Sequence, residues 1–271
     1  PWPLWPPVMV FLLAFAAMTS PWLSGSVSIP WDSKAHFLPQ IQFLAQSVWS
    51  GELPCWNPYV FSGQPQIADP QSMIFSPPYL LLALVDPSPG PRAQDATLLA
   101  AMATGGVGLI AWFRDKRWHW AGAIIAALAF TFGAAMAWRT HHPGQVLSLA
   151  SLPWALVCLD RAVERVSVVA GAMAGLVAAC IVLGRDQVAL LCVYLLVART
   201  LWLWLASDES GARIAASLLP LVVAALAGLA IVTLPVLMTV LLAADSNRPA
   251  IDFAGAGAGS LQPAHLVTFV I

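Results

Sequence analysis

The sequence contains little charge. Only 9% of its 271 residues are Asp, Glu, Lys or Arg, whereas soluble domains carry about 25%. Hydrophobic residues make up 59% of the chain, and its mean hydropathy is +0.78. A soluble core has no room for that much apolar surface. The composition therefore predicts an all-α, polytopic membrane protein.

Two further features that the sequence lacks, a basic run and a CxxC pair, reduce the number of possible functions. There is no extended basic run and the formal net charge is −1, which argues against nucleic-acid binding. The four cysteines form no CxxC pair; they are Cys55, Cys158, Cys180 and Cys192. The last three fall in apolar runs, so the cysteines support neither a metal site nor a disulfide framework.

Apolar runs long enough to cross a bilayer recur along the chain, since a spanning helix needs about 20 such residues. The seven predicted spans lie near residues 8–24, 95–113, 119–138, 145–160, 167–184, 187–205 and 213–243. Pro220 and Pro235 fall inside the last span and predict a kink or a tilt. Residues 74–86 are too few for a comfortable crossing, and we expect an interfacial or re-entrant helix there.

The spans predict one transmembrane domain over residues 1–271, incomplete at its C-terminus. Residues 25–94 are expected to form the first extracytoplasmic loop with interfacial helices, and residues 95–271 a helical bundle. The chain starts without an initiator Met and stops within an apolar segment, so we interpret it as a fragment.

Basic residues in the connections between the predicted spans indicate how the chain is oriented in the membrane. Residues 114–117 (RDKR), 161–165 (RAVER) and 207–213 (SDESGAR) fall on one side of this layout, which the positive-inside rule assigns to the cytoplasm. The N-terminus is then cytoplasmic too, with Trp2 and Trp5 at the interface. The remaining polar segments converge on the outer face; they are residues 25–73, 139–145, 184–187 and 245–263. We therefore expect any chemistry to take place outside.

Asp32 is the first candidate in the outer loop, close to where the first span leaves the membrane. Residues 33–50 after it have helical spacing and predict an amphipathic helix along the interface, with an apolar face of Phe37, Ile41, Leu44 and Val48. Two interpretations of Asp32 are open. It is either the N-cap of that helix or a general base at the edge of a dry cavity.

The other outer polar residues also have two interpretations each. Asp69 precedes a proline and either makes an Asx-turn or contributes a functional carboxylate. His141 and His142 follow Arg139 at a helix end, and adjacent residues on a helix do not share a face, so a metal is weakly supported.

The GRDQ segment and one further arginine supply outer charges. Arg185 and Asp186 form either a hairpin turn with a local ion pair or part of a functional site. The second alternative arises because charge at membrane depth is costly unless it serves a function. Arg248 is a further cation. Arginine suits phosphate because its planar guanidinium donates bidentate hydrogen bonds.

In their order, these segments resemble the YfhO family of bacterial membrane proteins. The matching stretches are WDSKAHFLPQ (31–40), SGELPCWNPYVFSGQPQIADPQSMIFSPPYLLL (50–82), HHPGQVLSLASLPWALVCLDRAV (141–163), GRDQ (184–187) and SNRPAIDFAGAGAGSLQPAHLV (246–267). The run GELPxWNPY, with GxP and ADPQ after it, is the most specific. GRDQ departs from the GHPQ expected of the family, and family members are longer than this chain.

The resemblance implies a GT-C-like membrane glycosyltransferase. Such enzymes transfer a sugar from a polyprenyl-phosphate carrier to an acceptor outside the bacterial cytoplasmic membrane, and some family members are linked to the decoration of lipoteichoic acid. An acidic residue in the first outer loop is the usual base of that fold, and Asp32 matches it. The implied partners are the lipid-linked sugar, an envelope glycopolymer or lipid acceptor, and the bilayer, with no nucleic acid.

The resulting hypothesis is an inverting, single-displacement transfer with Asp32 as base. The donor phosphate is assigned, in falling order, to Arg248, Arg139, Arg185 and His142. The acceptor or sugar is assigned to Asp69, Trp56, Asn57, Tyr59, Gln64 and Gln71. A divalent cation held at Asp69 is an open alternative, and no other cofactor is expected.

Three rivals stay open at this point: a transporter or flippase for lipid-linked precursors, a scaffold for envelope assembly, and a ligase or hydrolase acting on lipid carriers. Transport predicts inverted repeats and ionisable residues near the midplane. No clear repeat is present, and Arg199 is the only ionisable residue well inside a predicted span. Both observations favour chemistry at the outer face.

Overall fold

The structure is a computed structural model that describes residues 2–184, 186–208 and 210–246. Every named element in this part is a helix, and an isolated antiparallel bridge joins Asn57 and Gln64. In chain order the elements are α1 (Trp5–Ser24), η1 (Ser33–Phe37), α2 (Leu38–Trp49), α3 (Pro77–Val85), α4 (Pro91–Asp115), α5 (Trp120–Phe132), α6 (Ala134–Ala137), α7 (Pro143–Glu164), α8 (Val168–Val182), α9 (Gln187–Leu205) and α10 (Ser210–Asp245). The predicted all-α class is confirmed.

Six helical stretches are long and apolar enough to cross a membrane, namely α1, α4, α5 with α6, α7, α9 and α10. The chain is thus a multi-pass membrane protein, as its composition predicts. The predicted count of seven spans differs at α8, which has 15 residues. A helix of that length measures roughly 22 Å, against a hydrocarbon core of about 30 Å. Ser167 sets its start by accepting a hydrogen bond from the backbone N–H of Ala170.

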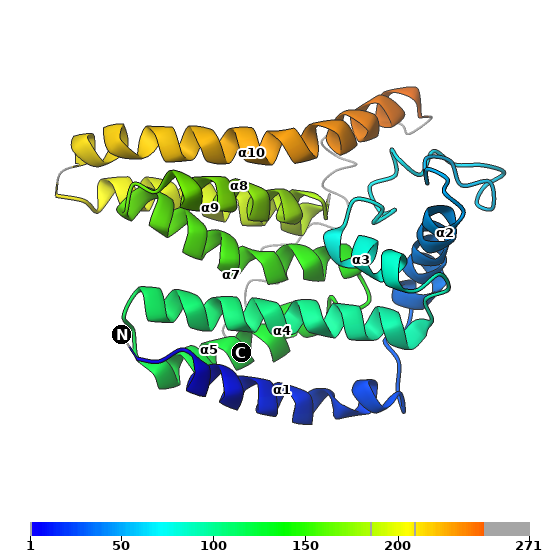
Figure 1. Ribbon diagram of the computed structural model, residues 1–271, viewed down its shortest axis with the longest axis horizontal. Helices are drawn as coiled ribbons and strands as arrows, with labels where there is room; N and C mark the ends of the chain where they lie inside the picture. Colours follow the sequence, from blue (N-terminus) through cyan, green and yellow to red (C-terminus); the bar gives the residue numbers. More distant parts are fainter. Residues whose placement is uncertain (1, 185, 209, 247–271) are drawn as a thin grey trace, which may run out of the picture.

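The long helices run side by side, and the polar loop gathers at one end of the bundle (Figure 1). We call this end the loop end; it holds residues 25–76, including η1 and α2, together with α3. There α2 runs across the direction of the long helices (Figure 1). The opposite end, which we call the charged end, holds the N-terminus and residues 112–120, 160–167 and 210–213.

Polar contacts join the connections at the charged end. Asp115 accepts hydrogen bonds from Arg161 at 3.1 Å and from Arg165 at 2.6 Å. Arg213 donates to the backbone carbonyl of Glu164 at 3.1 Å. The three basic connections therefore lie on one side of the bundle, as predicted. That this side faces the cytoplasm stays a prediction.

The helix after Asp32 buries the face predicted for it. Phe37, Ile41 and Leu44 are at most 3% exposed. Phe37 and Ile41 pack in one cluster with Met73, Tyr79 and Leu147. A helix with these positions buried is thus present as predicted, although its first turn is the π-helical turn η1. That it lies along the membrane interface stays a prediction. It packs against α3, the short helix predicted at residues 74–86.

A buried ion pair fastens the start of the loop to α4. The ammonium group of Lys34 pairs with Asp95, whose side chain is 4% exposed. Asp95 also accepts hydrogen bonds from the hydroxyl of Ser28 at 3.0 Å and the backbone N–H of Ile29 at 3.1 Å. These contacts hold the chain on both sides of Asp32 against α4, and so fix where Asp32 lies.

α8 and α10 approach each other closely at glycine positions. A Cβ atom at Gly171 would lie 2.2 Å from the carbonyl oxygen of Pro220. A Cβ atom at Gly175 would lie 2.0 Å from the carbonyl oxygen of Ala224. Small residues of this kind let membrane helices pack backbone to backbone. α10 therefore covers α8 on this side.

α10 is a continuous helix of 36 residues that includes Pro220 and Pro235. It starts at the charged end, where Arg213 contacts Glu164. Near its other end the hydroxyl of Thr239 donates to the carbonyl of Ala68 at 2.9 Å. The helix therefore contacts both ends of the bundle.

Candidate functional site

Asp32 lies between two irregular backbone features. Trp31 before it has a φ of 64°, a value that bulky L residues rarely adopt. The π-helical turn η1 follows it, and such turns are frequent at functional sites. Asp32 occupies the N-cap position of this helix, but its side chain makes no capping hydrogen bond. Its side chain is 56% exposed.

The carboxylate of Asp32 has His142 as its neighbour. The Nδ1 atom of His142, just before α7, lies 3.6 Å from Oδ2 of Asp32. Burial, followed by the charges of His141 and Arg139, lowers the pKa of His142, while Asp32 and Asp186 act in the opposite direction. His142 is therefore neutral at pH 7. In that state it offers a donor and an acceptor nitrogen, and its predicted contact with the donor phosphate stays a prediction.

His142 also lines a polar cavity of about 660 Å³ at the loop end. The wall comes from η1, the loop after Asp69, the start of α7 and the connection between α8 and α9. Its polar side chains are Gln71, His142, Gln145, Asp186 and Gln187, and its other residues are Phe37, Pro70, Met73, Gly144, Gly184 and Leu190. The cavity can therefore offer several hydrogen bonds to one ligand.

Asp186 is the carboxylate that lines this cavity. Its Oδ1 atom accepts a hydrogen bond from the backbone N–H of Ala189 at 3.0 Å and so caps α9. Burial raises the pKa of Asp186, against the opposing effects of the backbone N–H groups of Ala189 and Val188 and the charge of Arg139. This cap at the start of α9 agrees with the interpretation of GRDQ (184–187) as a turn between two helices. The cavity adds a second role, because the same carboxylate is within reach of a bound ligand.

Arg139 is the one predicted phosphate-binding arginine within the described part of the chain. Its guanidinium donates to the side-chain carbonyl of Gln145, which lines the cavity. Its charge also acts on both titratable groups of the cavity wall. Arg185 and Arg248 fall outside the described residues.

Asp69 holds the loop in shape. Its Oδ1 atom accepts from the backbone N–H of Gln71 at 2.9 Å, and its Oδ2 atom accepts from the amide of Gln64 at 2.8 Å. The first contact is the Asx-turn that the sequence offered as one interpretation. Asn57 makes the same kind of turn with the backbone N–H of Tyr59 at 3.0 Å. Direct contact of these residues with an acceptor sugar stays a prediction.

Two of the predicted sugar-binding residues present their rings to the outside. Trp56 is 57% exposed and Tyr59 is 81% exposed. The Trp56 ring covers Gly63, where a Cβ atom would lie 2.4 Å from the ring. Exposed, backbone-supported rings suit stacking on the apolar face of a pyranose.

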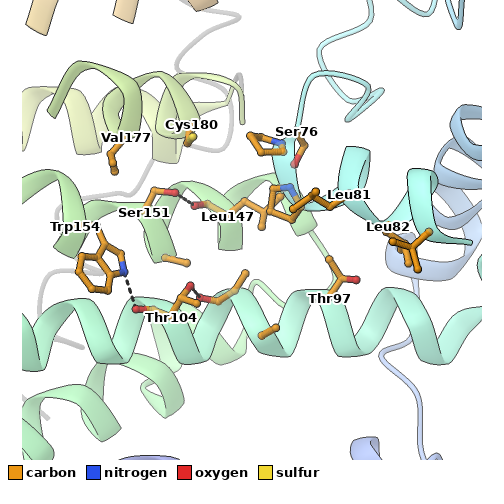
Figure 2. Close-up of a pocket in the computed structure, with 16 residues that line it drawn as sticks. Ser76, Leu81, Leu82, Thr97, Thr104, Leu147, Ser151, Trp154, Val177 and Cys180 are labelled. Atoms are coloured by element: carbon orange, nitrogen blue, oxygen red, sulfur yellow. Dashed lines mark hydrogen bonds between the residues drawn. The ribbon is translucent and has the colours of Figure 1, made fainter. Parts of the chain in front are cut away.

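An apolar groove of about 640 Å³ lies between α3, α4, α7 and α8 (Figure 2). Thr97, Thr104 and Ser151 line it, but each hydroxyl donates to a carbonyl of its own helix at 2.7 to 2.8 Å. The indole of Trp154 likewise donates to the carbonyl of Thr104 at 2.8 Å (Figure 2). The groove therefore presents an apolar surface to a ligand.

The cavity and the groove adjoin each other. Three segments of chain contribute one residue to the cavity and another, three or four positions away, to the groove: Met73 with Ser76, Gly144 with Leu147, and Gly184 with Cys180. In α7 and at the end of α8 this separation is about one helical turn, or 5 Å. Met73 and Ser76 are joined by a turn, in which the N–H of Ser76 donates to the carbonyl of Met73 at 2.9 Å. Together the two spaces fit a ligand with a polar head and a long apolar tail.

Sequence reasoning missed most of these lining residues. Small and apolar residues in a span look alike whether they face lipid, a partner helix or a groove, so nothing singled out Trp154 or Leu147. Gln145 and Gln187 carried a usable signal, because each begins an apolar span next to a candidate charge. Among the described residues, no three His, Cys, Asp or Glu side chains gather as metal ligands.

Comparison with known proteins adds no assignment. No protein-family model, no curated protein and no solved structure matches this chain.

Proposed function

We propose that the protein is a membrane glycosyltransferase of the GT-C type that transfers a sugar from a polyprenyl-phosphate carrier to an envelope glycopolymer or lipid acceptor. The YfhO resemblance motivates the reaction and places it at the outer face of the bacterial cytoplasmic membrane, with the N-terminus inside. Asp32 is the general base in this proposal.

One observation carries the proposal: the polar cavity and the apolar groove adjoin at the loop end. A polyprenyl-phosphate sugar has a charged head, several hydroxyls and a long hydrocarbon tail. The amide and carboxylate side chains of the cavity match the head, and the apolar groove matches the first isoprene units. A scaffold needs neither space.

In the proposed reaction Asp32 removes the proton from an acceptor hydroxyl. The oxygen then attacks the anomeric carbon as the bond to the phosphate oxygen breaks, which inverts the configuration. The phosphate leaves as an anion, so it needs nearby positive charge and no proton donor. Arg139 is the described cation beside the cavity, through Gln145.

The test uses the chain reconstituted in nanodiscs with radiolabelled polyprenyl-phosphate sugars and a panel of envelope acceptors. We expect label to move to an acceptor with wild-type protein. Asp32→Asn should slow this transfer by at least about 100-fold, the usual contribution of a general base. Asp86→Asn is the matched control, because Asp86 is a carboxylate at the end of α3 that accepts a hydrogen bond from the backbone N–H of Ser88 in a local turn.

A second arm tests the groove. Ala100 is exposed on α4 and lines the groove, so Ala100→Trp should weaken binding of the undecorated polyprenyl phosphate. Ala216→Trp, on an exposed face of α10 away from the groove, should leave it unchanged. If wild type binds the lipid but transfers no sugar, and labelled lipid instead crosses the bilayer, the protein is a flippase and the proposal fails. Equal transfer by wild type and Asp32→Asn removes Asp32 as the base.

A further inference from the structure

Four arginines surround a small cavity at the charged end, opposite the candidate site. The cavity has a volume of about 250 Å³ and is lined by Arg114, Asp115, Arg117, Arg161 and Arg165. Four guanidinium groups thus face one carboxylate. The arginines come from the end of α4 and the connection after it, and from the end of α7 and the connection after it, which are far apart in the sequence.

The single carboxylate does not balance the arginines. Asp115 pairs with Arg161 and Arg165. Arg114 donates from Nε to the backbone carbonyl of Trp2 at 3.1 Å. Within the described residues, no acidic side chain lies within ion-pair distance of Arg114 or Arg117. The cavity therefore has an excess of positive charge.

The preference for cations at the C-terminal ends of helices explains only part of this positive charge. Arg114 lies in the last turn of α4 and Arg161 in the last turn of α7, where cations are favoured by the helix dipole. Arg117 lies beyond the end of α4 and is held at a φ of 59°. The dipole effect falls off within the last turn, so it does not account for a guanidinium at this position.

An apolar cavity of about 380 Å³ accompanies the basic one and is lined by Trp2, Pro3, Pro6, Pro7, Val10 and Trp120. Trp2 connects the two cavities. It lines the apolar one, and its carbonyl accepts the hydrogen bond from Arg114 of the basic one. Its indole donates to the carbonyl of Trp118 at 2.8 Å. Tryptophans at helix ends mark the level of lipid headgroups, so both cavities lie at that level.

We propose that this pair of cavities binds an anionic phospholipid from the leaflet at the charged end. The phosphate lies among the arginines, with Arg114 and Arg117 as its unneutralised partners. One acyl chain lies along α1, against Trp2 and Trp120. A basic pocket between membrane helices is the kind of site that binds anionic headgroups.

The experiment titrates the purified full chain with phosphatidylglycerol and, separately, with phosphatidylcholine, and counts bound lipids by native mass spectrometry. We expect tight binding of phosphatidylglycerol only. Arg117→Gln should weaken it about fivefold, the effect of one basic residue near an anionic lipid surface. Arg213→Gln removes a charge at the same end but outside the cavity, and should leave the affinity unchanged.

A third arm uses inorganic phosphate and reads thermal stability. The lipid proposal predicts that phosphatidylglycerol raises the melting temperature and that millimolar phosphate does not. Equal effects of phosphate and lipid would show a site for the ion alone and overturn the proposal. It is also overturned if phosphatidylcholine binds as tightly, or if Arg117→Gln and Arg213→Gln weaken binding equally. Arg117 has no acidic partner among the described residues, so Arg117→Gln breaks no ion pair there.

Discussion

The guanidinium of Arg199 in α9 forms a bidentate pair with the carboxylate of Asp160 in α7. The Nε atom donates to Oδ1 and an Nη atom donates to Oδ2, each at 2.9 Å. The Asp160 side chain is completely buried and also accepts from the indole of Trp112 at 2.8 Å. Lys116 pairs with the same carboxylate at 2.6 Å. The one ionisable residue well inside a predicted span is thus used in packing.

Arg199→Met should therefore destabilise the protein strongly. Removing one partner leaves a buried carboxylate undercompensated, and we expect a loss of about 3 kcal/mol in the free energy of unfolding. Arg199→Lys, which keeps the charge but loses the bidentate geometry, should lose less. Denaturation in mixed detergent micelles measures both. A double variant with Asp160→Asn that loses as much as the two single variants combined would contradict the coupling.

The contact between α8 and α10 gives a second prediction. Gly175→Ala adds a methyl group where the carbonyl oxygen of Ala224 lies, and should cost about 1 to 3 kcal/mol as the helices are pushed apart. Gly211→Ala is the control, since no atom lies within 4 Å of its added Cβ. Thermal unfolding of both variants in one detergent compares them. Equal melting temperatures would show that the close approach is not used for stability.

The ion pair between Lys34 and Asp95 gives a third prediction, on loop dynamics. Lys34→Met should speed amide hydrogen exchange around Asp32, because the segment loses its anchor on α4. Exchange in α9 should stay unchanged. Exchanging the two residues, as Lys34→Asp with Asp95→Lys, should restore part of the protection. No change around Asp32 in the single variant would mean that Ser28 and Ile29 hold the segment by themselves.

The pKa of His142 predicts a pH dependence. Because burial lowers it, the unfolded chain binds a proton more readily than the folded protein does. This contribution is fully present above the ordinary histidine pKa of about 6.5 and is lost as the pH falls through the folded value. Asp186, whose pKa is raised, acts in the opposite direction at lower pH.

Melting temperatures of wild type and His142→Gln between pH 7.5 and 5 test this sign. We expect the wild type to lose stability on acidification through this range, and the variant to lose less. The difference between wild type and variant isolates His142 from other titrating groups such as Asp186. A variant that loses as much stability as wild type toward pH 5 would contradict the neutral state assigned to His142.

The sequence predicts the helices well and the site only in outline. The length and apolarity of each run set the helix bounds, and the spacing of Phe37, Ile41 and Leu44 identifies the buried face after Asp32. The Asx-turn of Asp69 is equally local, because it needs only residues 69–71. Each of these features depends on neighbours in the sequence.

What could not be predicted depends on packing between distant segments. Asp32 meets His142 only because Lys34 and Asp95, which are 61 positions apart, hold the loop on α4. The groove arises from four helices whose small residues face one another, and no single helix shows it. The basic connections were correctly grouped on one side, but nothing in the sequence indicated a cavity there.

α10 is longer than the hydrocarbon core of a membrane is thick. Its 36 residues extend about 54 Å, against a hydrocarbon core of about 30 Å. It is tied to Glu164 at one end and to Ala68 of the polar loop at the other. A thinner bilayer favours a larger tilt of so long a helix. Because Thr239 is hydrogen-bonded to Ala68, such a tilt would move this part of the loop. The position of Ala68, two residues before Pro70 of the cavity wall, would then depend on the thickness of the surrounding membrane.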